Sequence, residues 1–234
     1  MNEVATEQAD AVRLVEVSRR SPAGHQNMQA VYDAKPLVYK AAKRAFDVVA
    51  SAAALAALSP LLIGTAIAVV VEDGPPFIYS APRLGRDQRP FRMHKFRSMC
   101  RDAEGRLNEF LVKNEQTGAA FKIRDDPRVT RVGRLIRRTS IDELPQLVNV
   151  LVGEMSIVGP RPIQSTRPFT PYELQRLVVR PGITCYWQVA GRADVPWDEW
   201  VEMDLDYIED MSVWTDMRII AKTFGVVLRK AGAH

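Results

Sequence analysis

Residues 48–71 read VVASAAALAALSPLLIGTAIAVVV, and this stretch decides the fold. Its 24 residues carry no charge and lie between Asp47 and Glu72. A straight helix of this length would rise about 36 Å, enough to cross a bilayer core of about 30 Å. The segment is too long, and lies too far into the chain, to be a secretory signal peptide. It therefore indicates a helix in a membrane rather than a buried helix of a water-soluble core.

A serine and a proline, Ser59 and Pro60, stand in the middle of this apolar segment. Pro60 has no amide proton and its ring presses on the preceding turn, so the helix should bend or break there. Each half is then only about 18 Å long, which reaches into one leaflet but does not cross both. The break frees backbone carbonyls that need partners in lipid, and the Ser59 hydroxyl can satisfy only part of this need.

Basic residues flank the apolar segment on both sides. They are Lys35, Lys40, Lys43 and Arg44 before it, and Arg83, Arg86, Arg89, Arg92, Lys95 and Arg97 after it. The positive-inside rule keeps both flanks on the cytoplasmic side. A re-entrant helix–break–helix meets this constraint as well as the proline break, and we predict it. A kinked crossing stays open as the alternative, because proline kinks are common in true spans.

The remaining sequence divides around this segment into three parts. Residues 1–33 are polar, without sustained periodicity, and are predicted to be a flexible tail. Residues 34–73 combine a basic interfacial helix at 34–47, its lysines directed toward lipid headgroups, with the re-entrant helix. Residues 74–234 form one cytoplasmic domain that shares a fold with the membrane helix. The predicted fold class is mixed α/β, mainly helical, with short strands.

Turn residues and hydrophobic periodicity divide the third part into short elements. The predicted strands are 77–80, 91–96 and 184–189, and the predicted helices are 100–113, 128–138, 140–152, 172–179, 197–210 and 213–230.

The composition limits the class of ligand but does not identify the ligand. The chain is 47% hydrophobic and 26% charged, with a net charge of +4 and a pI of about 9.2. A polyanionic partner is indicated, and nucleic acid, anionic lipid and phosphorylated small molecules all qualify. Two distant cysteines and three scattered histidines predict neither a disulfide framework nor a histidine metal site.

A basic helix leads directly into an acidic pair. Its arginines include Arg137, and the pair is Asp142-Glu143. A carboxylate attacks phosphorus poorly unless the phosphate charge is neutralised, which arginines and a divalent cation can do. The chain has five such acidic pairs, however, so the pattern alone does not assign catalysis to this one.

The start of the helix at 140–152 has two interpretations. Ser140 and Glu143 fit a capping box, but Pro145 would then remove an internal hydrogen bond. With Asp142 as the N-cap, Pro145 falls in the first turn, where it is tolerated, and we favour this second interpretation. Either one places Asp142 at a helix N-terminus, where free amides keep a carboxylate ionised.

Three other features could bind an anion or a base. Arg161 projects from the rigid Gly-Pro-Arg-Pro loop at 159–162, which is otherwise a plain turn. Lys95 and Arg97 alternate with Phe96 along a strand, although an ordinary edge strand explains that pattern better. A late cluster of aromatics could stack on a base or lie at the lipid interface, but core packing is the default for most of them.

Taken together, these residues resemble the bacterial sugar transferase family, the monotopic polyprenyl-phosphate phosphoglycosyl transferases. The resemblance runs from about Lys43 to Arg229. Its motifs are KRAFD, the central SP, PRLGRD, KFRSM, DDPRVTRVGRLIRRTSIDELPQLVNVL, GEMSIVGPRP, RPGIT and WQVAGR.

The resemblance implies a reaction in two steps. Asp142 is implied to attack a UDP-sugar and release UMP, assisted by Glu143 through Mg²⁺ or proton handling. Polyprenyl phosphate then attacks the sugar-phosphoryl aspartate. The implied Mg²⁺ ligands are Asp142 and Glu143, and Ser59-Pro60 corresponds to the membrane break. The implied phosphate- and substrate-binding residues are Arg137, Arg161, Lys95, Arg97 and Gln146.

The implied setting is the cytoplasmic face of the bacterial inner membrane, at the first membrane step of exopolysaccharide, O-antigen or glycoprotein glycan synthesis. UDP-sugar, polyprenyl phosphate and membrane lipid are the expected partners, nucleic acid is not, and homo-oligomerisation stays open. Cys185-Tyr186 departs from the glycine usual after PGIT, and residues 100–121 resemble an insertion. Without the multi-span N-terminal region of the large members, the chain groups with the small ones or is part of a longer protein.

Two other function classes are compatible with parts of the sequence. A catalytically silent membrane adaptor of the same fold would need the apolar segment but not Asp142 or a metal. A nucleic-acid binder would explain the pI but not the apolar segment, and salt-sensitive binding to random DNA would reveal it.

Overall fold

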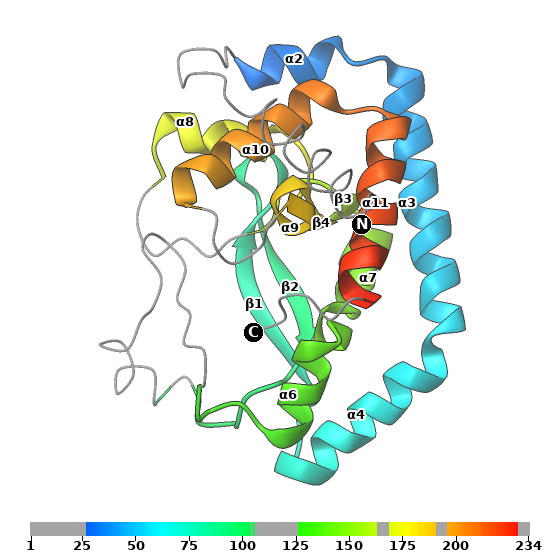
Figure 1. The fold of residues 1–234 in the computed structure, drawn as a ribbon, viewed down its shortest axis with the longest axis vertical. Helices are drawn as coiled ribbons and strands as arrows, with labels where there is room; N and C mark the ends of the chain where they lie inside the picture. Colours follow the sequence, from blue (N-terminus) through cyan, green and yellow to red (C-terminus); the bar gives the residue numbers. More distant parts are fainter. Residues whose placement is uncertain (1–26, 104, 106–125, 163–168, 191–195, 229–234) are drawn as a thin grey trace, which may run out of the picture.

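The computed structural model describes residues 27–103, 105, 126–162, 169–190 and 196–228 (Figure 1). The α-helices are α2 (Met28–Ala34), α3 (Leu37–Ala57), α4 (Ser59–Asp73), α6 (Arg131–Arg138), α7 (Gln146–Val152), α8 (Pro171–Leu174), α9 (Tyr186–Ala190), α10 (Trp197–Asp210) and α11 (Val213–Leu228). The strands are β1 (Ile78–Leu84), β2 (Pro90–Phe96), β3 (Ser156–Val158) and β4 (Gly182–Thr184). The 3₁₀ turns within these residues are η1 (Arg86–Gln88), η3 (Ile141–Glu143) and η4 (Gln175–Val178). The predicted class, mixed α/β and mainly helical, is confirmed.

The predicted helix break is present. α3 ends at Ala57 and α4 begins at Ser59, with a bend of 63° between them. Pro60 lies in the first turn of α4, where its missing amide is tolerated. The Ser59 hydroxyl donates to the carbonyl of Ala56 at 2.8 Å, and so supplies a partner for a carbonyl next to the break. Among the described helices none could cross a membrane alone, whereas the bent pair together has the required length and apolar composition.

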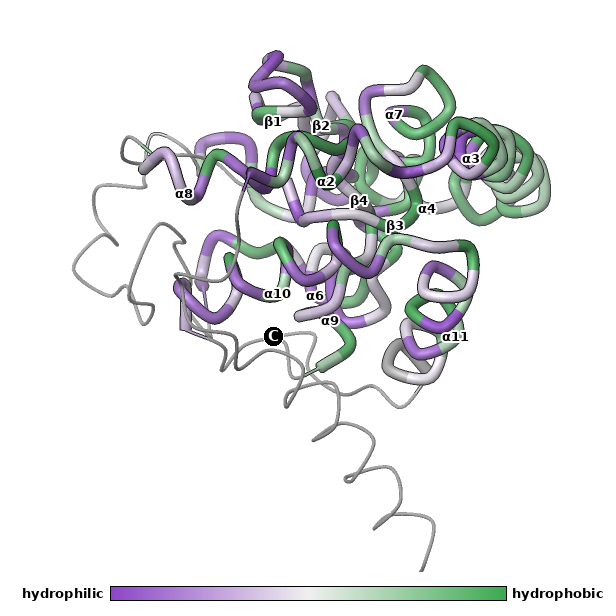
Figure 2. The backbone as a smooth tube through the Cα atoms, turned by 90° about the horizontal axis from the view of Figure 1, so that it is seen from above, coloured by the Kyte–Doolittle hydropathy of each residue, from purple (hydrophilic) through white to green (hydrophobic). Residues whose placement is uncertain are grey.

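The two faces of α3 differ in character. Leu37 and Val38 are each 80% exposed at its N-terminal end, and Figure 2 shows the α3 coil largely in the colour of hydrophobic residues. On the opposite face, Lys43 Nζ donates to the carbonyl of Val158 at 3.0 Å and binds the Asp216 carboxylate at 2.7 Å. The expectation that the lysines point toward headgroups is therefore wrong for Lys43, which anchors α3 to the protein.

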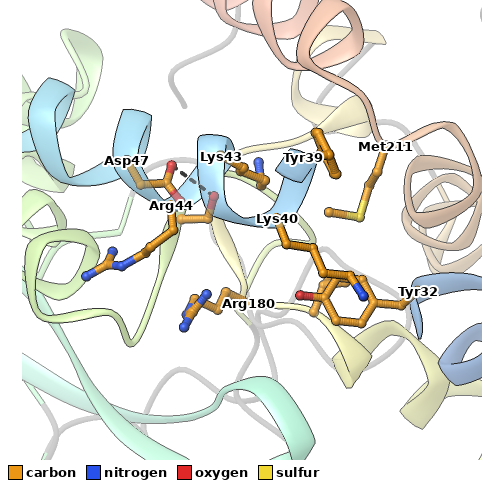
Figure 3. Close-up of a pocket in the computed structure, with 10 residues that line it drawn as sticks. Tyr32, Tyr39, Lys40, Lys43, Arg44, Asp47, Arg180 and Met211 are labelled. Atoms are coloured by element: carbon orange, nitrogen blue, oxygen red, sulfur yellow. Dashed lines mark hydrogen bonds between the residues drawn. The ribbon is translucent and has the colours of Figure 1, made fainter. Parts of the chain in front are cut away.

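Two more charged residues of α3 complete this anchor (Figure 3). The buried Asp47 carboxylate accepts from the Ser156 hydroxyl at 3.1 Å and from the amide of Ile157 at 3.0 Å. Arg44 donates to the carbonyls of Val150 and Leu151, at 2.6 and 2.9 Å, and thus caps the C-terminal end of α7. Cations at this end of a helix satisfy free carbonyls and complement the helix dipole.

α4 packs against the elements that lead to the acidic pair. Val69 of α4, Phe96 of β2 and Ile136 of α6 form a buried apolar cluster, with Ile141 beside it. The bent helix pair therefore runs along one side of the molecule (Figure 1) and contacts both α7 and α6.

The largest core cluster lies around α10 and includes α2. Met28 and Tyr32, one helical turn apart, are buried in it with Leu205 and Ile208. The Met28 amide donates to the Gln175 side chain at 3.0 Å. Residues 28–33, predicted above to be part of a flexible tail, thus belong to the folded domain. The reason is that Met28 and Tyr32 lie on one face of a short helix and that this face is buried against the core. Residues 1–26 lie outside the described residues.

The strands of the described residues form two sheets of two strands each. β1 and β2 pair antiparallel, with Ser80 opposite His94, over longer ranges than the sequence predicted. β3 and β4 pair parallel. The strand predicted at 184–189 is wrong, because β4 ends at Thr184 and residues 186–190 are helical. The predicted 172–179 helix is an α-helical turn followed by η4.

Two glycines explain where β4 begins. A Cβ at Gly182 would lie 2.1 Å from the amide nitrogen of Gly159, and a Cβ at Gly159 would lie 2.5 Å from the carbonyl oxygen of Arg180. Only glycines allow the two backbones to approach so closely. The parallel pairing therefore starts at Gly182, before the range that side-chain pattern predicted.

The two helices around the acidic pair also differ from expectation. α6 begins at Arg131 rather than 128, because the Thr130 hydroxyl accepts from the amide of Gly133 at 2.9 Å and sets the start. The helix predicted at 140–152 is divided into η3 and α7, with Pro145 as the N-cap of α7. The helix predicted at 100–113 falls mostly outside the described residues.

Candidate active site

Four elements bring the candidate residues together. β2 supplies Lys95 near its end, the last turn of α6 supplies Arg137, η3 supplies Asp142 and Glu143, and the loop after β3 supplies Arg161. η3 contacts both α6 and β2. Residues far apart in the sequence thus converge on one pair of carboxylates.

Glu143 is the centre of the ionic contacts. Its Oε1 accepts from Lys95 Nζ at 2.8 Å and from Arg161 Nη2 at 2.7 Å. Burial alone would raise the pKa of Glu143, but the charges and hydrogen bonds of Arg161 and Lys95 outweigh it and hold the pKa well below its usual range. Glu143 therefore favours its ionised form and holds Lys95 and Arg161 in place.

Asp142 is in a different state from its neighbour. It is 8% exposed, and its carboxylate makes no ion pair or hydrogen bond with any other residue that the structure describes. Burial, followed by the adjacent charge of Glu143, raises the pKa of Asp142 to about 6, against the opposing charges of Lys95, Arg137 and Arg161. A carboxylate in this state has lone pairs available for reaction.

Neither predicted cap of the 140–152 helix forms. Ser140 adopts a left-handed conformation (φ 58°) and its side chain makes no capping hydrogen bond. Glu143 is drawn instead to Lys95 and Arg161. Asp142 lies inside η3 and is not the N-cap of α7. Asp142 lies in the first turn of η3, but the expected lowering of its pKa is wrong, because burial and the charge of Glu143 outweigh the nearby cations and raise it.

The Arg137 side chain is positioned by Ser98, which lies two residues beyond the end of β2. Its Nε donates to the Ser98 hydroxyl at 2.8 Å. Burial lowers the pKa of Arg137, and the charges of Asp142 and Asp126 oppose that shift. Ser98, one residue beyond Arg97, was not singled out in the sequence. Its only signal there was its place in the KFRSM motif.

Arg97 and Gln146 occupy other positions. Arg97 Nη2 donates to the carbonyls of Asp73 and Gly74, at 3.2 and 2.5 Å, at the end of α4, so its contacts are with the membrane helix and not with Glu143. Gln146 is buried as the first residue of α7. Substrate binding by these two residues stays a prediction. Ser59 and Pro60 lie at the other end of α4, at the bend between α3 and α4, and their role as a membrane break stays a prediction.

A second buried ion pair supports the Arg161 loop. Arg176 Nη2 donates to the carbonyl of Arg161 at 2.8 Å and also binds the Asp204 carboxylate. The Arg161 guanidinium lies 5.7 Å from the Trp187 ring centre, so that one of the late aromatics reaches the site. Sequence patterns did not indicate Arg176 or Asp204, since each looks like an ordinary surface charge on a helix.

The donors present suit a magnesium ion shared with a substrate. Within the described part of the chain, no three histidine, cysteine or acidic side chains cluster as metal ligands. Mg²⁺ is commonly bound by one or two carboxylates together with phosphate oxygens and water. Two carboxylates could therefore bind Mg²⁺ here: Asp142, which has no ion pair among the described residues, and Glu143 through its second oxygen.

The bent apolar helix pair, packed on α6 and α7, and the nearby carboxylate pair held among cations define a membrane-associated protein with a buried acidic site. The chain belongs to the bacterial sugar transferase family, whose model matches residues 38–230. The recognition made from sequence motifs is thus confirmed.

Curated relatives are similar over most of the chain. Galactosyl transferase CpsE of Streptococcus agalactiae is 48% identical over 165 residues, 69% of this chain and 37% of that protein. Undecaprenyl-phosphate galactose phosphotransferase of Salmonella typhimurium is 45% identical over 204 residues, 82% of this chain and 41% of that protein. Exopolysaccharide production protein ExoY of Rhizobium meliloti is 38% identical over 199 residues, 82% of this chain and 88% of that protein. The chain thus spans about two fifths of the first two relatives and most of ExoY.

Proposed function

We propose that this protein transfers a sugar-1-phosphate from a UDP-sugar to polyprenyl phosphate, with release of UMP, through a covalent sugar-phosphoryl intermediate on Asp142. The observation that carries the proposal is the unpaired Asp142 carboxylate beside Glu143, whose two cations are already fixed. The name of the Salmonella relative, undecaprenyl-phosphate galactose phosphotransferase, describes a sugar phosphotransferase that uses a polyprenyl phosphate, which supports this proposal. The product would begin an exopolysaccharide, O-antigen or glycoprotein glycan.

In the first half-reaction, an oxygen of Asp142 attacks the phosphorus that bears the sugar. The bond from this phosphorus to the bridging oxygen breaks, and its electron pair leaves with UMP. Lys95, Arg137 and Arg161 lie where they neutralise the phosphate oxygens, which is the main contribution a protein makes to phosphoryl transfer. Because Glu143 already orients Lys95 and Arg161, little reorganisation is needed at the moment of attack.

In the second half-reaction, a phosphate oxygen of the polyprenyl carrier attacks the same phosphorus. The bond to Asp142 breaks and returns the free carboxylate, and the product is a diphosphate-linked sugar. Mg²⁺ held by Asp142 and Glu143 would supply further neutralisation of phosphate charge. The protein's own residues bind and orient the phosphates in both steps.

The bent pair α3–α4 places the reaction at a membrane. We propose that it enters and leaves the cytoplasmic face of the inner membrane, so that the lipid carrier's phosphate reaches Asp142 without crossing the bilayer. The bend of 63° and the exposed apolar residues of α3 support this arrangement. Cysteines introduced near residues 30 and 90 should both react only from the cytoplasmic side, and periplasmic labelling of either would contradict it.

The covalent intermediate gives the decisive experiment. Enzyme mixed with a radiolabelled UDP-sugar from a panel, but no acceptor, should release at most one UMP per protein and retain the sugar phosphate on Asp142. Addition of polyprenyl phosphate should discharge it. A catalytically silent adaptor would show neither event with any sugar. UMP release that requires the acceptor would instead indicate direct displacement.

A further inference from the structure

The last turn of α4 makes an unusual contact with α6. The Glu72 carboxylate accepts from the first two amides of that helix, Arg131 N at 2.7 Å and Val132 N at 2.9 Å. These amides have no partner within their own helix. A negative charge at this end also complements the helix dipole. The membrane helix therefore ends on the N-terminus of the helix that leads to the acidic pair.

The first turn of α6 has little freedom to move away from this contact. The Thr130 amide donates to the carbonyl of Ser98 at 3.2 Å. A Cβ at Gly133 would lie 2.0 Å from the same carbonyl oxygen, so the helix backbone is packed directly on Ser98. α6 is thus held between the end of α4 and the segment that follows β2.

The last turn of α6 returns to the same serine. Arg137 Nε donates to the Ser98 hydroxyl, and the Arg137 guanidinium is one of the charges that act on Asp142. The helix is only eight residues long, a rise of about 12 Å, and is stiff over that distance. A shift of its first turn therefore moves Arg137.

The end of α4 is itself firmly attached. Arg97 binds the carbonyls of Asp73 and Gly74, and the Arg101 amide donates to the Asp73 carboxylate at 3.0 Å. Together with the Val69 cluster, these contacts fix the last turn of α4, which contains Glu72.

We propose that Glu72 is a positioning residue, through which the bent membrane helix pair sets Arg137 and thereby the reactivity of Asp142. This inference rests on the proposed function. Glu72 touches no reacting atom. Through Glu72, the position of the helix pair in lipid determines the position of Arg137. The phosphate site therefore has its active geometry only when the helix pair is inserted in the membrane.

The test compares Glu72→Ala and Glu72→Gln with wild type in lipid nanodiscs. Glu72→Gln keeps one acceptor oxygen, and turns an amide donor toward the second backbone amide. Glu199→Ala is the matched control, because Glu199 is an exposed acidic residue in the first turn of α10. The measurements are the single-turnover rate of UMP release, the KM for the UDP-sugar, and hydrogen exchange of peptides that cover residues 131–138 and 200–208.

Glu72→Ala should slow UMP release about 10- to 100-fold, the size expected for misplaced catalytic groups, with little change in KM. Glu72→Gln should fall between Ala and wild type. Exchange should rise at 131–138 and stay unchanged at 200–208, which shows that the domain remains folded. Glu199→Ala should match wild type in the rate of UMP release, in KM and in exchange at 131–138.

Three results would overturn the inference. Unchanged exchange at 131–138 in Glu72→Ala would show that the contact is not made. Faster exchange with a wild-type rate would show that Glu72 only caps α6. A uniform rise in exchange at both peptides for both variants would assign the lost rate to unfolding. If wild type itself releases no UMP with any UDP-sugar, the proposed function fails, whereas exchange at 131–138 still reports the contact.

Discussion

Two buried aspartates of this protein, Asp142 in η3 and Asp204 in α10, both have a raised pKa but differ in their ionic partners. Burial is the first cause in each case, and it raises the pKa of both to about 6. Asp204 is 1% exposed and bound to Arg176, which is 1% exposed as well. Asp142 has no such partner among the described residues. Burial and a raised pKa therefore do not distinguish a reactive carboxylate from a structural one.

The difference lies in how the neighbouring cations are used. Arg176 forms its ion pair with Asp204 itself. Lys95 and Arg161 instead form ion pairs with Glu143 and affect Asp142 only through their charge. A second carboxylate thus holds the cations so that the first stays unpaired. Of two adjacent acids, the one with the fewer contacts is the better candidate nucleophile.

The largest expected effect is on turnover, from Asp142→Asn. This change keeps the shape of the side chain but removes its charge and its nucleophilic oxygen, so the loss should exceed the roughly 10²- to 10⁴-fold typical of a missing acid or base. Radiolabelled transfer to polyprenyl phosphate measures it, with membrane binding and melting temperature as controls. Residual activity above a few per cent, in protein free of deamidation, would remove Asp142 from the role.

Arg176→Met should mainly affect stability. It leaves Asp204 buried without its partner, which typically costs about 3–5 kcal/mol. Thermal unfolding in detergent measures the loss. The double variant Arg176→Met/Asp204→Leu should recover much of it, because an apolar pair can replace a buried ion pair. If the single variant melts like wild type, the comparison with Asp142 is unfounded.

Arg137→Ala should slow the first half-reaction by less than Asp142→Asn does. It removes one stabilising charge, worth about 3–4 kcal/mol by analogy with a lost oxyanion donor, and leaves the reacting atom in place. Burst kinetics of UMP release measure the rate. Arg134→Ala, an exposed neighbour in α6, is the matched control and should retain the wild-type rate.

The smallest effect is the pH dependence. Asp142 attacks only when ionised, and its raised pKa of about 6 means that protonation removes the nucleophile below that pH. The UMP-release rate should therefore be constant above about pH 7 and fall roughly tenfold per unit below pH 6. A pH–rate profile between pH 4.5 and 8 measures this. An acidic limb near pH 4 would show that the cations around Asp142 outweigh burial.

The parts of this fold that sequence predicted depend on local chemistry. Pro60 has no amide proton whatever surrounds it, so the break could be placed to within one residue. α10 and the start of α11 follow from helical periodicity alone. The acidic pair at 142–143 was indicated by its basic neighbours and identified by resemblance.

The parts that sequence did not predict depend on distant partners. A capping box at Ser140 and Glu143 is reasonable locally, but Lys95 and Arg161 arrive from a strand and a loop and bind Glu143 more strongly. Arg176 and Asp204 are 28 residues apart, and no local pattern pairs them. The predicted flexible tail extended too far, to residue 33, because the burial of Met28 depends on contacts with the distant helix α10.

The mutual approach of Gly159 and Gly182 has a consequence for which substitutions this protein can accept. A side chain at either position would push the backbone that carries Arg161 away from Glu143. A side chain at either glycine is therefore expected to misplace Arg161. A change of donor sugar should therefore come from side chains elsewhere, around an arginine whose backbone these two glycines fix.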